Sequence, residues 1–278
     1  ISSIFIFSMI GLIGIMSFIL APEIEARFAF PNAIETFLPN GFKGFGIAAM
    51  LAIIMSSADA FMNAPITGVN GGLVVVSADD PSMHSSQNEQ DSRYYGKFAQ
   101  IPILEPINQQ EAYDMMPYAF EMSERLNVPV LMRITTRLAH SRAGILLGEK
   151  TPQNKLALPK NPRQFVLLPG IARKQYNLLL ENMPNINQES EIAGFNKYYE
   201  GTDKSMGIIT TGIAYNYLME NYPDGINHPV LKIAQYPLPT EMVRKLYNEC
   251  DTIMVMEEGY PIVEEQLRGV LDNGKKIF

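Results

Sequence analysis

The sequence predicts an α/β protein with parallel sheets, preceded by two hydrophobic helices. Between residues 72 and 135, apolar runs rich in β-branched residues alternate with one long stretch of helical periodicity. The same alternation returns between residues 206 and 271. Alternating strands and helices indicate parallel sheets with right-handed crossovers. The third observation is an uncharged apolar run near the N-terminus, which is typical of a membrane helix.

Composition narrows the class of function. The chain has 278 residues, of which 47% are hydrophobic and 18% charged, and its net charge is -7. This is typical of a globular protein with one large or two small domains. Because no basic patch or arm is present, we expect no nucleic-acid partner. The single cysteine, Cys250, cannot hold an iron–sulfur cluster, which needs about four thiolates. The first residue is Ile1, and the chain stops within an apparent strand, so we expect a piece of a longer protein.

Residues 1–64 are predicted to form the two hydrophobic helices. Residues 4–21 carry no charge, and a second apolar run covers residues 45–58. A membrane-spanning helix needs about 20 such residues, and the features of a signal peptide are absent. The second run is short for a membrane helix, so a buried soluble helix is the alternative. We expect a membrane-like segment that contacts a membrane through residues 1–58.

The sequence of this segment resembles that of a known family. The string LPNGFKGFGIAAMLAIIMSSADAFMN at residues 38–63 resembles the eighth transmembrane helix of the sodium/solute symporters, and residues 1–22 resemble the preceding helix. In that family the positions of Ser56 and Ser57 contribute hydroxyls to a sodium site. A transporter needs two repeats around such a site, which two helices cannot supply. We therefore favour small-residue helix packing as the role of both serines.

A polar loop follows the first predicted strand of the next segment. The apolar run Gly72–Ala78 ends at Asp79, and the residues from there to Arg93 are almost all polar. In open α/β sheets ligands bind at the carboxyl ends of the strands, so this loop is a candidate site. The alternative is a solvated connection. Within the loop, Glu89 and Asp91 are expected to pair with Arg93 as local structure.

The next elements lead to a second polar loop. Residues 101–105 are predicted to form a strand, and Asn108 is expected to cap a helix, with Glu111 at the capping-box spacing. The helix ends at Asn127, and a third strand covers residues 128–135. Residues 135–142 then form a polar loop. It is expected to leave the same sheet edge as the first loop.

Both loops resemble one enzyme family. The strings SADDPSMHSSQNEQDSRYYGKFAQIPILEP at residues 77–106 and LMRITTRLAHSR at residues 131–142 resemble the alpha subunit of indolepyruvate ferredoxin oxidoreductase. That family uses thiamine diphosphate and iron–sulfur clusters. The resemblance covers about residues 66–278. It implies that residues 65–145 are a partial pyrimidine-type domain of a thiamine enzyme.

The two loops supply eight candidate site residues, namely His84, Ser85, Ser86, Gln87, Asn88, Arg137, His140 and Arg142. The histidines are candidate proton carriers near neutral pH. The arginines are candidates for binding the carboxylate of a 2-oxo acid in a bidentate way. The serines and amides offer hydrogen-bond donors to a developing oxyanion. For each residue taken singly, a structural role is the alternative.

Residues 146–162 are predicted to be a linker, and residues 163–278 a second α/β domain. Strands are expected at 206–211, 228–234 and 252–256, helices at 171–183, 213–222, 240–248 and 261–271, and a loop at 185–205. The strings GIITTGIAYNYL and VMEEGYPIVEEQLR resemble the transketolase C-terminal-like domain of the same subunit. Because adjacent strand residues point to opposite faces, one of Glu257 and Glu258 is expected to be buried and the other solvated.

The resemblance implies cofactors that this chain is not expected to bind alone. They are thiamine diphosphate, Mg²⁺ and [4Fe-4S] clusters. The glutamate that tautomerises the aminopyrimidine lies upstream in the family, in the portion that residues 1–64 replace here. The string at residues 224–227 lacks the spacing of the family's Gly-Asp-Gly…Asn motif and is predicted to be a turn. We expect the isolated chain to be inactive.

Three functions remain at this stage. The first is a partial alpha subunit that decarboxylates aryl pyruvates oxidatively to acyl-CoA, with a beta subunit, ferredoxin and coenzyme A, and with residues 65–278 in the cytoplasm. The second is a fragment of a sodium/solute symporter. The third is a non-catalytic fused α/β scaffold. The resemblance changes from one family to the other near residues 63–67, and this favours a fused reading frame.

Overall fold

The computed structural model describes residues 71–149, 161–166 and 168–270. The chain divides into two compact units, Ile1–Ala60 and Phe61–Phe278. The predicted hydrophobic helices, with Ser56 and Ser57, lie outside the described residues. So does the predicted change of family near residues 63–67. Across the described ranges, none of the helices combines the length and apolar character needed to cross a membrane.

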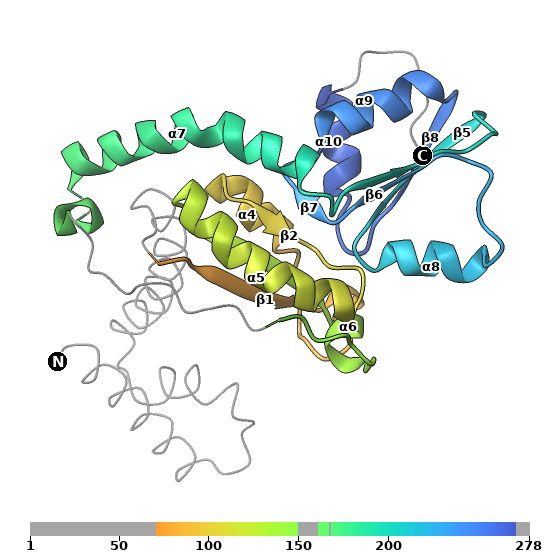
Figure 1. Ribbon diagram of the computed structural model, residues 1–278, viewed down its shortest axis with the longest axis horizontal. Helices are drawn as coiled ribbons and strands as arrows, with labels where there is room; N and C mark the ends of the chain where they lie inside the picture. Colours follow the sequence, from red (N-terminus) through yellow and green to blue (C-terminus); the bar gives the residue numbers. More distant parts are fainter. Residues whose placement is uncertain (1–70, 150–160, 167, 271–278) are drawn as a thin grey trace, which may run out of the picture. The chain divides into compact units, whose positions relative to one another are not determined.

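The first described sheet has the strand order β1-β3-β2-β7 (Figure 1). Its strands are β1 (Val74–Asp79), β2 (Ile103–Leu104), β3 (Val130–Thr135) and β7 (Gln235–Tyr236). The first three pair in parallel, as predicted, and β7 pairs antiparallel with β2. The antiparallel strand was not predicted. It comes from the second half of the chain and joins the two halves through one sheet.

The second described sheet has the order β4-β6-β5-β8. Its strands are β4 (Lys197–Tyr199), β5 (Met206–Thr211), β6 (Val230–Ile233) and β8 (Thr252–Met256). β5, β6 and β8 are parallel, and β4 pairs antiparallel with β6. Both sheets therefore carry the predicted parallel strands, with an antiparallel strand at one edge.

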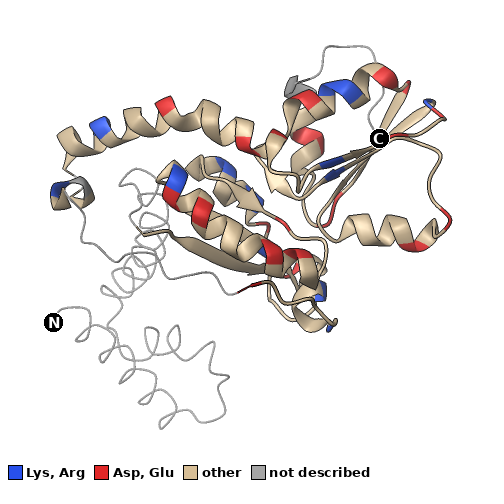
Figure 2. Ribbon diagram, in the orientation of Figure 1, with Lys and Arg blue, Asp and Glu red and all other residues tan. Residues whose placement is uncertain are grey.

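Helices and short 3-10 turns complete the described part. They are η2 (Pro81–Met83), α4 (Arg93–Ala99), α5 (Gln109–Leu126), α6 (Thr136–His140), η3 (Pro162–Phe165), α7 (Pro169–Ile192), α8 (Ala214–Asn221), α9 (Thr240–Glu249) and α10 (Ile262–Val270). Asn108 caps α5 as predicted, because its side chain accepts a 2.8 Å hydrogen bond from the amide of Glu111. Helix α5 carries four acids and one basic residue, Arg125 in its last turn, whereas α9 carries two residues of each sign (Figure 2).

Two predictions about local structure were wrong. The second polar loop is largely the short helix α6. The predicted loop at residues 185–205 is instead the end of α7 followed by β4. Pro184 lies within α7, directly after the predicted end of the helix at residue 183. The helix continues past it because Ile186 packs in the core, and because Glu189 forms a 2.7 Å ion pair with Arg125 of α5.

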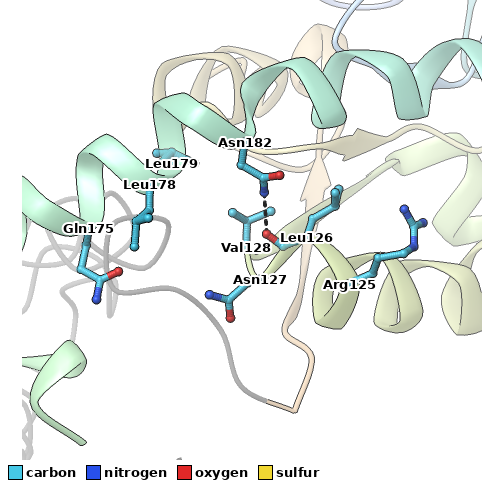
Figure 3. Close-up of a pocket in the computed structure, with 8 residues that line it drawn as sticks. All are labelled: Arg125, Leu126, Asn127, Val128, Gln175, Leu178, Leu179 and Asn182. Atoms are coloured by element: carbon cyan, nitrogen blue, oxygen red, sulfur yellow. Dashed lines mark hydrogen bonds between the residues drawn. The ribbon is translucent and has the colours of Figure 1, made fainter. Parts of the chain in front are cut away.

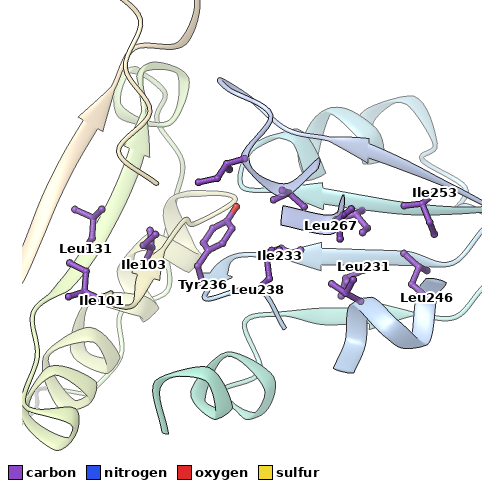
Figure 4. Packing of buried hydrophobic residues seen from close by; sticks show 14 of the residues in the cluster. Ile101, Ile103, Leu131, Leu231, Ile233, Tyr236, Leu238, Leu246, Ile253 and Leu267 are labelled. Atoms are coloured by element: carbon purple, nitrogen blue, oxygen red, sulfur yellow. The ribbon is translucent and has the colours of Figure 1, made fainter. Parts of the chain in front are cut away.

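One hydrophobic cluster joins the two sheets (Figure 4). It contains Ile103 and Leu131 of the first sheet, Tyr236 of β7, and Leu231 and Ile253 of the second sheet. Each of these side chains is at most 3% exposed. Burial of a large apolar side chain contributes about 1.5–3 kcal/mol. The first sheet is therefore packed against the second half of the chain.

Candidate functional site

The two predicted polar segments begin at neighbouring positions on one edge of the first sheet. β1 ends at Asp79 and β3 ends at Thr135, and these residues pair across the parallel strands. The prediction that both segments leave the same edge is therefore confirmed. Since ligands bind at the carboxyl edge of open α/β sheets, this edge is the candidate site.

Asp80 holds the first half of the loop between residues 79 and 93. Its Oδ2 accepts 2.6 Å hydrogen bonds from the backbone amides of Ser85 and Ser86. Its Oδ1 accepts a 2.5 Å hydrogen bond from the hydroxyl of Thr136 at the start of α6. The bond from Thr136 and those two amides hold the pKa of the Asp80 carboxyl well below its usual range. The loop thus turns around a carboxylate that also ties it to α6.

Asp79 holds the second half of the same loop. Its Oδ2 accepts hydrogen bonds of 2.8 and 2.9 Å from the amide and hydroxyl of Ser92. The same oxygen accepts a 2.6 Å hydrogen bond from Nε of Arg133 on β3. Adjacent carboxylates at the end of β1 therefore anchor both halves of the loop.

Arg133 lies at the centre of a buried ionic cluster and is 0% exposed. Besides Asp79, its guanidinium donates to the carboxylate of Glu105 at the end of β2. It also donates a 3.0 Å hydrogen bond to the backbone carbonyl of Glu258, which follows β8. Arg133 therefore connects three elements at the carboxyl edge.

Arg93 is the second fully buried guanidinium of this cluster. It lies 2.5 Å from Asp91, which confirms that half of the predicted pairing, and 3.0 Å from the carboxylate of Glu257. Among the described residues, no ion pair joins Arg93 to Glu89, the other predicted partner. It also donates a 2.9 Å hydrogen bond to the backbone carbonyl of Tyr260. The end of the loop is thereby fixed to the segment after β8.

Four buried carboxylates face these two guanidiniums, so two negative charges need other partners. Backbone amides and hydroxyl groups supply them. Tyr236 donates a 2.7 Å hydrogen bond from its hydroxyl to Glu105. The amide of Tyr260 donates to Asp91 at 3.1 Å, and the amide of Val263 at the start of α10 donates to Glu257 at 3.1 Å. Such donors are needed for a buried charge that lacks a full counter-charge.

The pKa values of the acids in the ionic cluster are shifted in opposite directions. Burial raises the pKa of Asp91, but the hydrogen bond from Arg93 and the charges of Arg133 and Arg93 outweigh it, so the net shift is downward. Burial raises the pKa of the Glu257 carboxyl in spite of the positive charge of Arg93. Burial and the nearby charge of Glu105 raise the pKa of the Tyr236 phenol well above its usual value.

The sequence analysis missed most of this cluster. Arg133 and Glu105 were included within predicted strands and given no role. A sequence signal was present, because each is a charged residue inside an otherwise apolar run. Buried charges are paired in proteins, so their opposite signs suggested a pair. Of the two adjacent glutamates, Glu257 is buried as expected, since its side chain is 7% exposed. The expectation that the other is solvated was wrong, because the Glu258 side chain is only 18% exposed and its Oε2 is buried.

The eight predicted site residues lie mainly on the surface of this edge. Seven are exposed and Ser86 is half-buried. The hydrogen bond from Thr136 to Asp80 brings the His84 loop and α6 together. No hydrogen bond or ion pair within the described ranges joins His84, His140 and Arg142 to one another.

The loop donors are only partly available to a ligand. The backbone amides of Ser85 and Ser86 already donate to Asp80, and the Ser85 hydroxyl lies 3.4 Å from the same oxygen. The side chains of Gln87 and Asn88 are exposed. Any oxyanion bound here would therefore depend on side chains of the loop rather than on these two amides.

A cavity lies away from this edge (Figure 3). It has a volume of about 270 Å³ and lies between the end of α5 and α7, where Asn182 donates a 2.7 Å hydrogen bond to the carbonyl of Leu126. Val128, just before β3, lines it. The cavity is therefore at the amino end of the strand whose carboxyl end carries the polar loops. It is the less favourable position for a ligand in a parallel sheet.

Metal-ligand chemistry is not evident in the part of the chain that the structure describes. There, no three His, Cys, Asp or Glu side chains form a group that could hold a metal ion. Cys250 is buried in the apolar cluster. The string Asp224–Asn227 lies in the turn and bend after α8, with Gly225 in the left-handed region at φ 101°.

Comparison with known proteins gives relatives for most of the chain. The indolepyruvate oxidoreductase subunit IorA of Pyrococcus horikoshii is 40% identical over 247 residues, which cover 85% of this chain and 38% of the relative. IorA of Thermococcus kodakarensis is 38% identical over 88% of this chain and 40% of the relative. This chain is similar to IorA. It spans about two fifths of the length of these curated relatives.

The same comparison corrects the expectation for the N-terminal segment. The resemblance to sodium/solute symporters is not supported, because the relatives found are IorA subunits. A match over 85% of 278 residues is also longer than residues 64–278. It therefore includes residues that were expected to resemble a symporter.

Two further comparisons add little. No family model matches the chain. A solved structure titled split gene transketolase, inactive beta4 tetramer, is 12% identical with a TM-score of 0.43, covering 81% of this chain and 63% of that one. A similarity at that level carries no argument about function.

Proposed function

We propose that residues 65–278 are part of the alpha subunit of a thiamine-diphosphate-dependent indolepyruvate:ferredoxin oxidoreductase. The enzyme would decarboxylate an aryl 2-oxo acid oxidatively and transfer the acyl group to coenzyme A. The observation that carries this proposal is the 40% identity to IorA of Pyrococcus horikoshii over 85% of the chain. Since the chain spans only 38% of that relative, the activity belongs to a larger assembly.

The proposal assigns a role to each half of the described chain. Residues 65–145 are the pyrimidine-type half domain and residues 163–278 the transketolase C-terminal-like domain, joined by the linker at residues 146–162. The paired ends of β1 and β3 support this assignment, because they present two polar segments on one carboxyl edge. That edge forms one wall of the site.

The exposed side chains of this wall supply binding and proton-transfer groups. Arg137 and Arg142 bind the carboxylate of the 2-oxo acid, which suits the planar guanidinium. His84 and His140 carry protons near neutral pH. Gln87 and Asn88, whose side chains are exposed, donate hydrogen bonds to the oxygen that gains charge.

The described residues do not themselves fit the cofactors of this enzyme class. A diphosphate held through Mg²⁺ needs a cluster of oxygen ligands. Within the described ranges no three His, Cys, Asp or Glu side chains are placed to hold a metal ion, and the buried carboxylates of the ionic cluster are paired with Arg93 and Arg133. The Asp224–Asn227 string lies in a turn and bend. Iron–sulfur clusters need thiolates, and the whole sequence has one cysteine. We therefore assign thiamine diphosphate, Mg²⁺ and the [4Fe-4S] clusters to other parts of the assembly.

The proposed reaction also fixes the partners. A beta subunit completes the enzyme, ferredoxin accepts the electrons, and coenzyme A accepts the acyl group. These are the components of the class of enzyme proposed for the intact protein. Residues 65–278 are accordingly placed in the cytoplasm, where ferredoxin and coenzyme A are found.

A chimeric enzyme tests the proposal. Residues 71–270 of this chain replace the matching part of Pyrococcus horikoshii IorA, which is then assembled with its beta subunit. We expect coenzyme A-dependent reduction of methyl viologen with indolepyruvate as substrate. An Arg142→Gln variant of the chimera is expected to raise KM for indolepyruvate at least tenfold, while Lys174→Gln on the exposed face of α7 leaves it unchanged.

The outcomes separate clearly. Activity with indolepyruvate, lost without coenzyme A, supports the proposal. An assembled chimera that contains its cofactors but reduces no acceptor with any 2-oxo acid overturns it. If the chain is a non-catalytic scaffold, the second result is expected.

A further inference from the structure

The guanidinium of Arg137 is held by the second half of the chain. It lies 3.7 Å from Oε1 of Glu258 and 5.5 Å from the centre of the Tyr217 ring. Glu258 follows β8, and Tyr217 is on α8. The Arg137 side chain is 57% exposed, whereas that of Glu258 is 18% exposed. The exposed guanidinium thus lies against a partly buried acid and an aromatic face.

The contact between these two charges is loose. At 3.7 Å the atoms are an ion pair but too far apart for a hydrogen bond. The backbone carbonyl of Glu258 is fixed by hydrogen bonds from Arg133 at 3.0 Å and Arg93 at 3.3 Å. The acid is therefore firmly placed. Arg137, in contrast, keeps donors that another carboxylate can use.

Unpaired polar atoms gather around this contact. In the ranges that the structure describes, four buried side-chain oxygens lack a hydrogen-bond partner, and three belong to Thr135, Tyr217 and Glu258. Thr135 is 5% exposed and lies on the same face of β3 as Arg133, two residues before Arg137. The charge of Glu258 raises the pKa of Tyr217 further than burial alone, which places the phenol near that acid.

Buried polar atoms normally have partners, so this group is incomplete. Two of the three unpaired oxygens are hydroxyls that can donate: that of Tyr217, whose ring faces the Arg137 guanidinium, and that of Thr135 at the end of β3. A phenol is protonated at neutral pH and can therefore donate a hydrogen bond. A phenol donor beside a guanidinium matches the needs of a carboxylate. Glu258 is the only carboxylate that an ion pair places at Arg137 among the described residues.

We propose that Glu258 is a resident carboxylate that holds Arg137 in the absence of substrate, and that the carboxylate of a 2-oxo acid displaces it. In the bound state the substrate accepts hydrogen bonds from Arg137 and from the hydroxyl of Tyr217, with Thr135 beside them. This inference rests on the proposed function for the class of substrate. It adds Tyr217 and Glu258 of the second domain to the substrate site. In this site Glu258 competes with the substrate carboxylate for Arg137.

Binding of phenylpyruvate to the full chain tests the inference without turnover. Isothermal titration calorimetry compares the wild type with Glu258→Gln, Tyr217→Phe and Arg137→Gln. Removing the competing charge in Glu258→Gln is expected to lower Kd at least threefold. Removing a donor to a charged group in Tyr217→Phe is expected to raise Kd by about tenfold. Arg137→Gln is expected to raise it further.

Controls and a double variant separate competition from structure. Glu241→Gln and Tyr222→Phe, which remove an exposed acid and an exposed phenol, are expected to leave Kd unchanged. In the Arg137→Gln background, Glu258→Gln is expected to lose its effect, because the competitor has nothing to hold. A merely structural role of Glu258 predicts the same change in both backgrounds. Because Arg137 is largely exposed, its replacement leaves the fold intact.

Three results overturn the inference: no phenylpyruvate binding by the wild type, binding that Arg137→Gln leaves unchanged, or weaker binding in Glu258→Gln. These results do not depend on catalysis. If the chain binds phenylpyruvate with the expected pattern but the chimeric enzyme has no activity, the proposed function fails and the carboxylate site stands. If the chimera is active and the variants do not change Kd, only this inference fails.

Discussion

The guanidinium of Arg93 lies 3.0 Å from the carboxylate of Glu257, which is 164 residues further along the chain. Arg93 closes the polar loop after β1, and Glu257 follows β8 of the second sheet. Both side chains are buried, at 0% and 7% exposure. The pair therefore fixes the candidate site of one half of the chain to the framework of the other.

Arg93→Met tests the stability of this junction. Removing the cation leaves buried carboxylates without compensation, so we expect a loss of about 3–5 kcal/mol in the free energy of unfolding. Urea unfolding followed by circular dichroism measures it. Arg173→Met, at an exposed position of α7, is the control and is expected to change stability by less than about 0.5 kcal/mol. Equal effects of the two substitutions contradict the role of the pair.

Local patterns were sufficient for most elements and for the position of the site. The run that ends at Asp79 and the run that ends at Thr135 each identified a parallel strand, and parallel strands place their ends on one edge. Helix α5 followed from its cap at Asn108 and its periodic apolar residues. These features depend on neighbours close in sequence.

The remaining features depend on partners far away in sequence. The pairing of β7 with β2 joins Tyr236 to Ile103, and no local pattern of two residues specifies it. A proline inside a helix normally kinks or breaks it. At Pro184, however, the tertiary contacts of Glu189 and Ile186 keep α7 helical beyond the proline. The ion pair between Arg93 and Glu257 joins residues 164 positions apart, so no local pattern could predict it.

Asp80→Asn is expected to show a specific dependence on pH. The folded-state pKa of Asp80 is lowered, first by the hydrogen bond from Thr136 and then by the amides of Ser85 and Ser86. An acid of this kind stabilises the folded state fully above its unfolded pKa of about 3.8, and the stabilisation is lost as the pH falls toward the folded pKa. The melting temperature of the variant is therefore lower than that of wild type by a constant amount from pH 7 to about 5.

Below about pH 3.8 that difference between wild type and variant should shrink. Thermal unfolding at a series of pH values measures it. Asp114→Asn, at an exposed position of α5, is the control and should show no such trend. A difference that grows as the pH falls has the wrong sign for a lowered pKa and would rule out the anchoring role of Asp80.

Gly259→Ala tests the packing of the loop against the segment after β8. Gly259 has φ 106°, and a Cβ there would lie 2.8 Å from Oδ2 of Asp91 and 3.1 Å from the guanidinium of Arg133. Gly225 has φ 101° with nothing within 4 Å, so Gly225→Ala isolates the backbone strain. We expect about 1–2 kcal/mol for Gly225→Ala and at least about 2 kcal/mol more for Gly259→Ala. Denaturant unfolding of both variants gives the difference, and equal losses would show that Asp91 moves aside freely.

Asn196 connects the end of α7 to the corner between β6 and β7, and it is 3% exposed. Its Nδ2 donates to the carbonyls of Ser190 and Gln235 at 2.8 and 2.9 Å. Its Oδ1 accepts from the amides of Ala234 and Gln235 at 2.8 and 2.9 Å. One side chain therefore satisfies four buried backbone groups where the chain passes from the second sheet to the first.

Asn196→Ala leaves all four of these groups without their partner, so we expect a loss of about 3 kcal/mol or more in the free energy of unfolding. Asn187→Ala, an exposed asparagine of α7, is the matched control and should cost less than about 0.5 kcal/mol. Asn196→Asp keeps the acceptor and loses the donor, so above its pKa it leaves a carboxylate facing two carbonyls. Its stability should therefore rise toward that of wild type as the pH is lowered and the carboxyl gains a proton that it can donate. A loss in Asn196→Asp that is the same at pH 4 and pH 8 contradicts the donor role, and chemical denaturation at the two pH values measures it.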